Sequence, residues 1–176
     1  NLSLPCIDTL HAVAYAFWTQ SDGQAPVLVS EEAAKRLFAE VNPEFRGARL
    51  SAAWQDLSLS RETMSPLPVY PGSGEAVAAE NYARQKAAWN LVDFTDLLEF
   101  WLEKIRVGSF QSPFRHILVD EVQDLSPLQL AVLEGLAQSP EVSVFAIGDP
   151  NQSIYGFRGA ASDMAGRLGR LWPDLV

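Results

Sequence analysis

The segment "HILVDEVQDLSPLQ", residues 116–129, together with "VSVFAIGD", residues 142–149, decides the fold of this chain. Both contain uninterrupted apolar runs, which are typical of parallel strands covered on both faces. Between them, Ser126, Pro127 and Gln129 make a capping box with proline at the first helical position, and the helical sequence "LAVLEGLA" follows. Residues 116–149 are therefore predicted to form a strand–helix–strand unit with parallel strands, as in α/β folds.

The rest of the chain is predicted to be mostly helical. Three segments with helical character are found at residues 9–20, 30–41 and 74–105. Thr9 is a suitable N-cap for the first of them, and Asn90 marks a break in the third. Residues 2–8 suggest a short strand, whereas the weak periodicity of 42–74 favours short helices and loops. We expect an α/β core at both ends of the chain, with a helical insertion over residues 20–89.

Composition and charge restrict the function classes. The chain has 176 residues, of which 48% are hydrophobic and 20% charged, as in a folded globular protein. No apolar run approaches the roughly 18 residues of a membrane span. The single cysteine, Cys6, excludes an internal disulfide and favours a reducing compartment, so a cytoplasmic location is expected. A net charge of −9 with scattered basic residues argues, taken alone, against a nucleic-acid-binding surface.

Carboxylates follow both predicted strands. Asp120 and Glu121 come directly after one apolar run, and Asp149 comes after the other. In open α/β sheets ligands bind beyond the carboxyl ends of the strands. One carboxylate there can hold Mg²⁺ and its neighbour can orient or deprotonate an attacking water, as nucleotide hydrolysis requires. The alternative is that Asp120 and Glu121 only end the strand and face solvent.

The stretch "GDPNQSIYGFRGA", residues 148–160, concentrates further functional groups. It contains one amide side chain, two aromatic rings and one arginine, namely Gln152, Tyr155, Phe157 and Arg158. An amide can contact phosphate, and aromatic rings can stack nucleic-acid bases irrespective of their sequence. The alternative is an ordinary loop whose two rings are buried in the core.

The order of these two motifs resembles that of a known family. "VDEVQD" followed by "GDPNQSIYGFRGA" resembles motifs II and III of the UvrD/Rep-type superfamily 1 DNA helicases. "TLHAVAYAFW", residues 9–18, is similar to the family segment "TFHS", and "NLVDFTDLLEFW", residues 90–101, is similar to "ALDFDDLL". Phe157 stands where the family often has tryptophan, and Ala12 stands where "TFHS" has serine. The resemblance covers both ends of the chain and leaves residues 20–85 matched only as an inserted helical subdomain.

The resemblance implies a fold, two cofactors and a set of site residues. The fold would be a partial RecA-like P-loop NTPase domain, made of residues 1–19 and 90–176, with 20–89 as the insertion. The cofactors would be ATP and Mg²⁺. Asp120 would bind the magnesium and Glu121 would activate the hydrolytic water. The residues on the nucleotide side would be Gln123, Asp124, Asp149 and Gln152. Gln152 would sense the γ-phosphate. Gln123 and Asp124 would link the site to neighbouring motifs.

The remaining residues of the family motifs would contact DNA or support the fold. Tyr155, Phe157 and Arg158 would bind single-stranded DNA, and Thr9 and His11 would lie against its backbone. Asp93 and Asp96 are assigned a structural role, because no chemical role suggests itself. The implied activity is an ATP-dependent 3′-to-5′ DNA helicase or translocase acting on single-stranded DNA and duplex junctions.

The phosphate-binding loop G-x-x-x-x-G-K-[ST] does not occur among the 176 residues. By the resemblance it would precede Asn1, so we expect this chain to be a piece of a longer polypeptide whose remainder completes the site. We expect the piece alone to be inactive. Three alternatives stay open: the motor of an AddA/RecB-type helicase–nuclease, a degenerate helicase that only binds DNA, and, less favoured by its few carboxylates, a two-metal nuclease.

Overall fold

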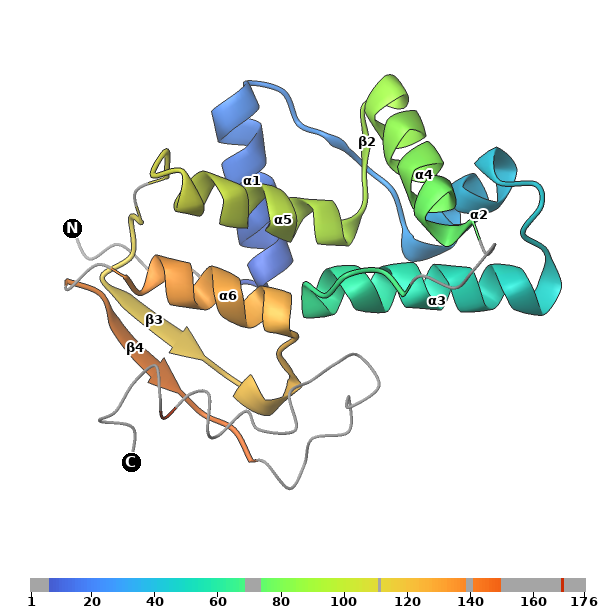
Figure 1. Cartoon of the computed structure of the whole chain (residues 1–176). Helices are drawn as coiled ribbons and strands as arrows, with labels where there is room; N and C mark the ends of the chain where they lie inside the picture. Colours follow the sequence, from blue (N-terminus) through green and yellow to red (C-terminus); the bar gives the residue numbers. More distant parts are fainter. Residues whose placement is uncertain (1–6, 69–73, 111, 139–140, 150–168, 170–176) are drawn as a thin grey trace.

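The computed structural model describes residues 7–68, 74–110, 112–138, 141–149 and 169 (Figure 1). Within these ranges it contains six α-helices, four short strands and one 3₁₀ helix. In chain order they are α1 (Leu10–Asp22), β1 (Val27–Leu28), α2 (Glu31–Val41), α3 (Gly47–Thr63), α4 (Glu75–Trp89), β2 (Leu91–Val92), α5 (Phe94–Arg106), β3 (His116–Val119), η1 (Val122–Asp124), α6 (Pro127–Leu136) and β4 (Ser143–Ala146). The predicted strand at 2–8 lies almost wholly outside the described residues.

The predicted strand–helix–strand unit is confirmed. Strands β3 and β4 pair in parallel with Ile117 opposite Val144 and Val119 opposite Ala146, and α6 connects them (Figure 1). The start of α6 has the predicted capping box: the Ser126 hydroxyl accepts from the Gln129 backbone, and the Gln129 side chain accepts from the Ser126 backbone. Local sequence signals therefore determine the part of the fold that carries the carboxylates.

The prediction that both faces of these strands are covered is wrong for the described part of the chain. Side chains alternate between the two faces of a strand. Ile117 and Val119 point towards the hydrophobic cluster below α6, whereas Leu118 and Phe145 are 78% and 60% exposed. An apolar run shows that both faces can be buried, but it does not show that both have a partner.

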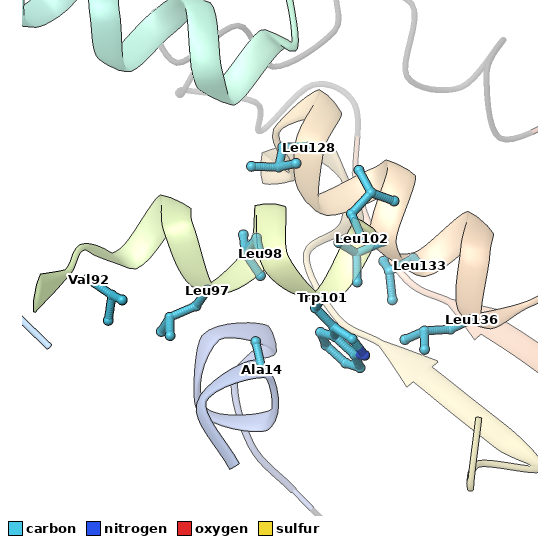
Figure 2. Close-up of a cluster of buried hydrophobic side chains, with 10 residues drawn as sticks. Ala14, Val92, Leu97, Leu98, Trp101, Leu102, Leu128, Leu133 and Leu136 are labelled. Atoms are coloured by element: carbon cyan, nitrogen blue, oxygen red, sulfur yellow. The ribbon is translucent and has the colours of Figure 1, made fainter. Parts of the chain in front are cut away.

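The main hydrophobic core lies between α1, α5 and α6 (Figure 2). Helix α5 is central because its residues Leu97, Leu98 and Trp101 are almost completely buried and face both neighbours. Leu128 and Leu133 close the core from the side of α6. This packing fixes the position of α6, and Ile117 and Val119 of β3 pack against the same cluster, so the strand ends are supported by the main hydrophobic core.

A second hydrophobic cluster lies between α2, α3 and α4. Its centre is aromatic: Phe38 and Trp54 both contact the ring of Tyr82 edge-on, at centroid distances of 5.9 and 5.6 Å. Asn42 is fully buried beside them and donates to the carbonyl oxygens of Phe38 and Ala78. The cluster contains no residue of the main core, so helices α2–α4 have a core of their own.

The prediction of short helices and loops over 42–74 is wrong for its longest part. Residues Gly47–Thr63 form one helix of 17 residues, α3. Only Ala53 and Leu57 of this helix are buried, so its apolar stripe is narrow and the periodicity in the sequence is correspondingly weak. Tertiary packing against Phe38 and Tyr82 stabilises this helix, and the local sequence pattern does not predict it.

Two short parallel strands join helices α2–α4 to the main core. Val27 pairs with Leu91 and Leu28 pairs with Val92, and the Val29 backbone N–H donates to the Val92 carbonyl. The predicted break at Asn90 is confirmed, because Asn90 has the left-handed φ of 52° that ends α4. The chain thus leaves the main core after α1 and returns beside its point of departure.

Candidate functional site

The two carboxylates of the sequence motif lie where β3 ends. Asp120 Oδ1 accepts a hydrogen bond of 2.9 Å from the Glu121 backbone N–H, and both residues are exposed. Glu121 has φ 50° and ψ 43°, in the left-handed region that non-glycine residues seldom adopt. Such a conformation costs on the order of 1–2 kcal/mol and persists where the surroundings require it. It turns the chain from β3 directly into η1.

The turn brings η1 back onto the strand that follows α6. The Val122 N–H donates to the Ile147 carbonyl at 3.0 Å, and the Ile147 N–H donates to the Val119 carbonyl at 2.8 Å. These bonds extend the contact between the two chain segments beyond the last ladder pair of β3 and β4. The two predicted carboxylate-bearing strand ends are therefore adjacent, as the parallel pairing implied.

Gln123 connects the two strand ends through its side chain. It is only 4% exposed. Its Nε2 donates to Glu121 Oε2 at 2.5 Å, and its Oε1 accepts from the Asp149 N–H at 3.1 Å. The amide thus holds the Glu121 carboxylate on one side and the backbone at the end of β4 on the other.

Gly148 is required by this contact. A Cβ atom added to Gly148 would lie 2.3 Å from Gln123 Oε1 and 2.7 Å from Val122 Cγ1. Any side chain at position 148 would therefore displace the Gln123 amide. Gly148 therefore allows the chain after β4 to approach Val122 and Gln123 closely.

Asp124 lies in η1 beside this group. Its backbone N–H donates to the Glu121 carbonyl at 2.9 Å, which closes the 3₁₀ turn. Its Oδ1 is buried and has no hydrogen-bond partner in the described structure. Because a buried unpaired carboxylate oxygen is unfavourable, this atom is a point where a further donor would be accommodated.

Four predicted site residues, namely Gln152, Tyr155, Phe157 and Arg158, lie outside the described residues. Thr9 and His11 are described, and they lie at the start of α1. The Thr9 hydroxyl caps α1 by accepting from the Ala12 N–H at 3.2 Å, as the sequence predicted. Thr9 therefore keeps its hydroxyl hydrogen for a further partner.

His11 packs edge-on against Phe94, with the ring centroids 5.6 Å apart. Burial lowers the pKa of His11, and the nearby Glu62 carboxylate opposes that effect only in part. The lowered pKa favours the neutral imidazole, which could contact a phosphate through an N–H group but not through a positive charge.

Asp93 and Asp96 belong to a buried ionic cluster with Arg61, Lys86 and Glu99. Lys86 Nζ lies 2.6 Å from Asp93 Oδ2 and 2.5 Å from Asp96 Oδ2. Arg61 contacts three carboxylates, at 2.8 Å from Asp93 and 2.7 Å from each of Asp96 and Glu99. The two aspartates also form the capping box of α5. These contacts are those of residues that support the fold, in line with the structural role predicted from the sequence.

The electrostatics of the ionic cluster follow from its burial. Burial alone would raise the pKa of Asp93, but the charges of Arg61 and Lys86 outweigh it and hold this pKa well below its usual range. Burial raises the pKa of Asp96, and the neighbouring Asp93 charge adds to that effect. The pKa of the Tyr82 hydroxyl, which donates to Asp93 at 2.9 Å, is raised mainly by burial.

Sequence reasoning missed Arg61 and Lys86. Lys86 could have been found, because it lies four residues after Tyr82 and eight after Ala78, on the buried face of α4. A lysine on an apolar face indicates a buried ion pair. Arg61 had no such signal, since its three carboxylate partners lie more than thirty residues later.

One groove among the described residues lies away from the strand-end carboxylates. It measures about 770 Å³ and is lined from α3, α5 and α6 by Ser60, Arg61, Met64, Ser65, Glu99, Leu102, Glu103, Arg106 and Leu128. It contains none of the strand-end residues, so it adds nothing to the candidate site.

Among the described helices, none is long and apolar enough to cross a membrane.

The chain was compared with known proteins. The family model for the UvrD/REP helicase N-terminal domain matches residues 31–169. DNA helicase IV of Escherichia coli is 46% identical over 74 residues, which are 42% of this chain and 11% of the relative. The putative ATP-dependent DNA helicase YjcD of Bacillus subtilis is 41% identical over 86 residues, 46% of this chain and 11% of the relative.

A third relative carries a second activity in its name. This ATP-dependent helicase/nuclease component of Staphylococcus haemolyticus is 28% identical over 137 residues, 72% of this chain and 11% of the relative. The matched part of this chain thus spans about a tenth of the length of these relatives. The family match includes both strand ends, the Gln123 contact and the ionic cluster. The chain belongs to the UvrD/REP helicase N-terminal domain family.

Proposed function

We propose that this chain is part of an ATP-dependent DNA helicase that moves 3′ to 5′ along single-stranded DNA, including at duplex junctions. The observation that carries the proposal is the pair Asp120 and Glu121 at the end of β3, held against the end of β4 by Gln123. The family and the names of the relatives support ATP use and DNA as the substrate.

Asp120 fits the role of the magnesium ligand in this site. It is exposed at a strand end, and its Oδ1 accepts only from the adjacent backbone N–H among the hydrogen bonds described. Mg²⁺ in nucleotide sites is held by one or two carboxylates, with phosphate oxygens and water completing the shell. A bound magnesium ion would neutralise charge on the phosphates.

Glu121 is proposed as the group that orients and deprotonates the attacking water. The residue is exposed, and one of its carboxylate oxygens accepts a hydrogen bond from Gln123. A carboxylate restrained on one side and open on the other can accept a water proton in a defined direction. Gln123, Asp124 and Asp149 would support the nucleotide side, and Gln152 would sense the γ-phosphate.

The DNA-contacting residues are proposed from the family motifs. Tyr155 and Phe157 would stack bases, Arg158 would contact the backbone, and Thr9 and His11 would approach the backbone from α1. Thr9 retains a hydroxyl hydrogen and the lowered pKa of His11 favours its neutral form, so both would act as hydrogen-bond donors. This agrees with the net charge of −9, which leaves little positive charge for phosphate binding.

The domain organisation is proposed on the same basis. Residues 1–19 and 90–176 would belong to a RecA-like core, and 20–89 would be an inserted helical subdomain. The two separate hydrophobic clusters support this division. The single cysteine supports a cytoplasmic location.

The proposed function is tested with the protein as its gene encodes it. ATP hydrolysis is measured with and without single-stranded DNA in the native protein and in Glu121→Gln, which keeps the shape of the side chain and removes the base. We expect DNA-stimulated turnover in the native protein and a loss of about 100-fold or more in the variant. Glu103→Gln, an exposed position on α5, is the control and should behave as native.

Two outcomes distinguish the alternatives. No DNA-stimulated turnover in the native protein would favour a degenerate helicase that only binds DNA. Cleavage of DNA by the native protein would favour the motor of a helicase–nuclease, an alternative supported by the name of the Staphylococcus haemolyticus relative.

A further inference from the structure

Helices α2, α3 and α4, which we call the helical unit, meet the main core at two places. The hydrophobic cluster of the helical unit and the main hydrophobic cluster share no buried residue. The first place is β2, where Val92 belongs to the main cluster and Leu91 packs against the other. The second is the end of α3, which approaches α5 and α6 (Figure 1) at the ionic cluster and the groove of about 770 Å³. This second contact is therefore held by ion pairs rather than by a shared apolar core.

The charges of the ionic cluster are divided by sign between the two parts. Both cations, Arg61 and Lys86, belong to the helical unit. The three carboxylates are Asp93, the N-cap of α5, and Asp96 and Glu99 within that helix. Their spacing of three residues places them along one face of α5. Every ion pair of the cluster therefore joins the helical unit to the main core, and none lies within one part.

Arg61 contacts this face of α5 in fixed directions. Its Nη1 donates to Asp93 at 2.8 Å, and its Nη2 donates to Asp96 and to Glu99 at 2.7 Å. Its Nε donates to the second oxygen of Glu99 at 3.0 Å. A guanidinium group is planar and its donors keep a rigid geometry. A shift of α3 along α5 would therefore break several hydrogen bonds at once, whereas apolar contacts have no preferred direction.

Burial makes any other pairing of these charges unfavourable. The side chains of Arg61 and Lys86 are 17% and 7% exposed, and that of Asp93 is 10% exposed. Water has little access to such groups, and a buried charge without a partner is strongly disfavoured. Compared with apolar residues of similar volume, a buried ion cluster adds little net stability, but it can select one arrangement over its alternatives.

We propose that the ionic cluster determines the orientation of the helical unit on the main core, with Arg61 as the positioning residue. Without the Arg61 contacts, the helical unit would remain attached at the β1–β2 ribbon, which pairs two residues on each strand, and would adopt more than one orientation. The inference goes beyond the proposed function and does not use it, because the orientation can be measured without nucleotide or DNA.

The orientation is measured as a distance between two spin labels. The labels are attached at Glu40→Cys on α2 and Gln138→Cys after α6, both exposed positions, in the gene-encoded protein with its other cysteines replaced by serine. Distance distributions from electron–electron double resonance are compared for this parent, Arg61→Met and Glu99→Gln. Arg106→Met is the matched control, because Arg106 is exposed, lines the same groove and has no ion pair within the described part of the chain.

We expect one narrow distance distribution in the parent and in Arg106→Met. In Arg61→Met, alternative distances should rise from an undetectable level to about 10% of the molecules or more, the population at which a competing conformation is readily observed. Glu99→Gln should give a smaller change in the same direction, because Arg61 keeps its two aspartate partners. Melting temperatures are recorded for all four proteins. A cluster that only stabilised the fold would lower the melting temperature and leave the distribution narrow.

Three results would overturn the inference. The first is an unchanged, narrow distribution in folded Arg61→Met, whatever its melting temperature. The second is a broad distribution in the parent, and the third is equal broadening in Arg106→Met. If Arg61→Met does not fold, Glu99→Gln decides by itself, since the Glu99 side chain is 42% exposed and its loss is the milder change. A broadened distribution in Glu99→Gln would then support the inference, and an unchanged one would reject it.

Discussion

Glu121, at the end of β3, is proposed to supply a reactive carboxylate and also has an unfavourable backbone conformation. Glu121 adopts a left-handed backbone at a position where glycine would be more stable. The sequence identified Glu121 as a functional candidate from its type and from the preceding apolar run. It could not indicate the backbone state, because that state depends on the contact of η1 with the segment after β4, which is a tertiary feature. The same holds for the bridging position of Gln123.

At Glu121, the residue that the proposed activity needs is expected to be less stable in this backbone conformation than glycine. Glu121→Gly should be more stable than Glu121→Ala by about 1 kcal/mol, because only glycine adopts φ 50° without strain. Both variants should be inactive in DNA-stimulated ATP hydrolysis, since both lack the carboxylate. Thermal unfolding of the two proteins, followed side by side, measures the difference. Equal melting temperatures would show that the left-handed backbone carries no strain.

At the scale of elements, the ionic cluster joins α3, α4 and α5. Arg61 comes from the end of α3, Lys86 from α4, and the three carboxylates from the start of α5. The elements carrying local signals were predicted well: the capping box of α6, the break at Asn90, the parallel pair β3–β4. Helix α3, the β1–β2 pairing and the partners of Arg61 were not, because each depends on contacts between segments far apart in the chain.

Removal of one buried cation is expected to be strongly destabilising. Lys86→Met should lower the free energy of unfolding by about 3–5 kcal/mol, because it removes one of the two cations that contact the buried Asp93 and Asp96 carboxylates. Arg36→Met is the matched control: Arg36 and Glu32 form a pair whose side chains are 71% and 78% exposed. Its loss should change stability by about 0.5 kcal/mol or less. Chemical denaturation measures the free energy of unfolding of both variants. Similar decreases in the two variants would show that the ionic cluster does not stabilise the packing of α3, α4 and α5.

Lowering the pH should reduce the stability that Asp93 contributes through the ionic cluster between α3, α4 and α5. The folded pKa of Asp93 lies below its unfolded value of about 3.9. The contribution of Asp93 to stability is therefore complete above that value and is lost as the pH falls below it. Asp93→Asn should be less stable than the native protein at pH 7 and should lose less stability between about pH 5 and pH 2. Melting temperatures over this range test the sign, and parallel pH curves would contradict it.

At the scale of the whole molecule, the proposed half of a nucleotide site rests on the main hydrophobic core of the described residues. The strand ends are supported by α6 and the main hydrophobic cluster, but the G-x-x-x-x-G-K-[ST] sequence does not occur in the 176 residues. The α/β class and the helical insertion could be expected from the sequence. The exposure of Leu118 and Phe145 within the described part of the chain could not, since apolar patterning gives no information on which partner is present.

Nucleotide should have little effect on these 176 residues alone. A ligand present at about 100 times its Kd would stabilise a folded protein by about 2.7 kcal/mol. We expect no measurable rise in melting temperature of the polypeptide 1–176 with millimolar Mg·ATP, because no backbone cradle or lysine for the phosphates is found in its sequence. The gene-encoded protein, tested under the same conditions, should show a rise. A clear rise in the short polypeptide would mean that the strand-end carboxylates form a nucleotide site unaided.

The β1–β2 ribbon has a consequence for how such proteins diversify. Residues 27–28 and 91–92 lie side by side although much of the chain separates them, so the segment between them is a cassette with adjoining ends. Insertions whose two ends lie close together are tolerated by the fold that carries them. Laboratory grafts that keep the β1–β2 pairing and the Arg61 contacts should therefore be tolerated, so the segment between the two strands can be exchanged without altering the main core.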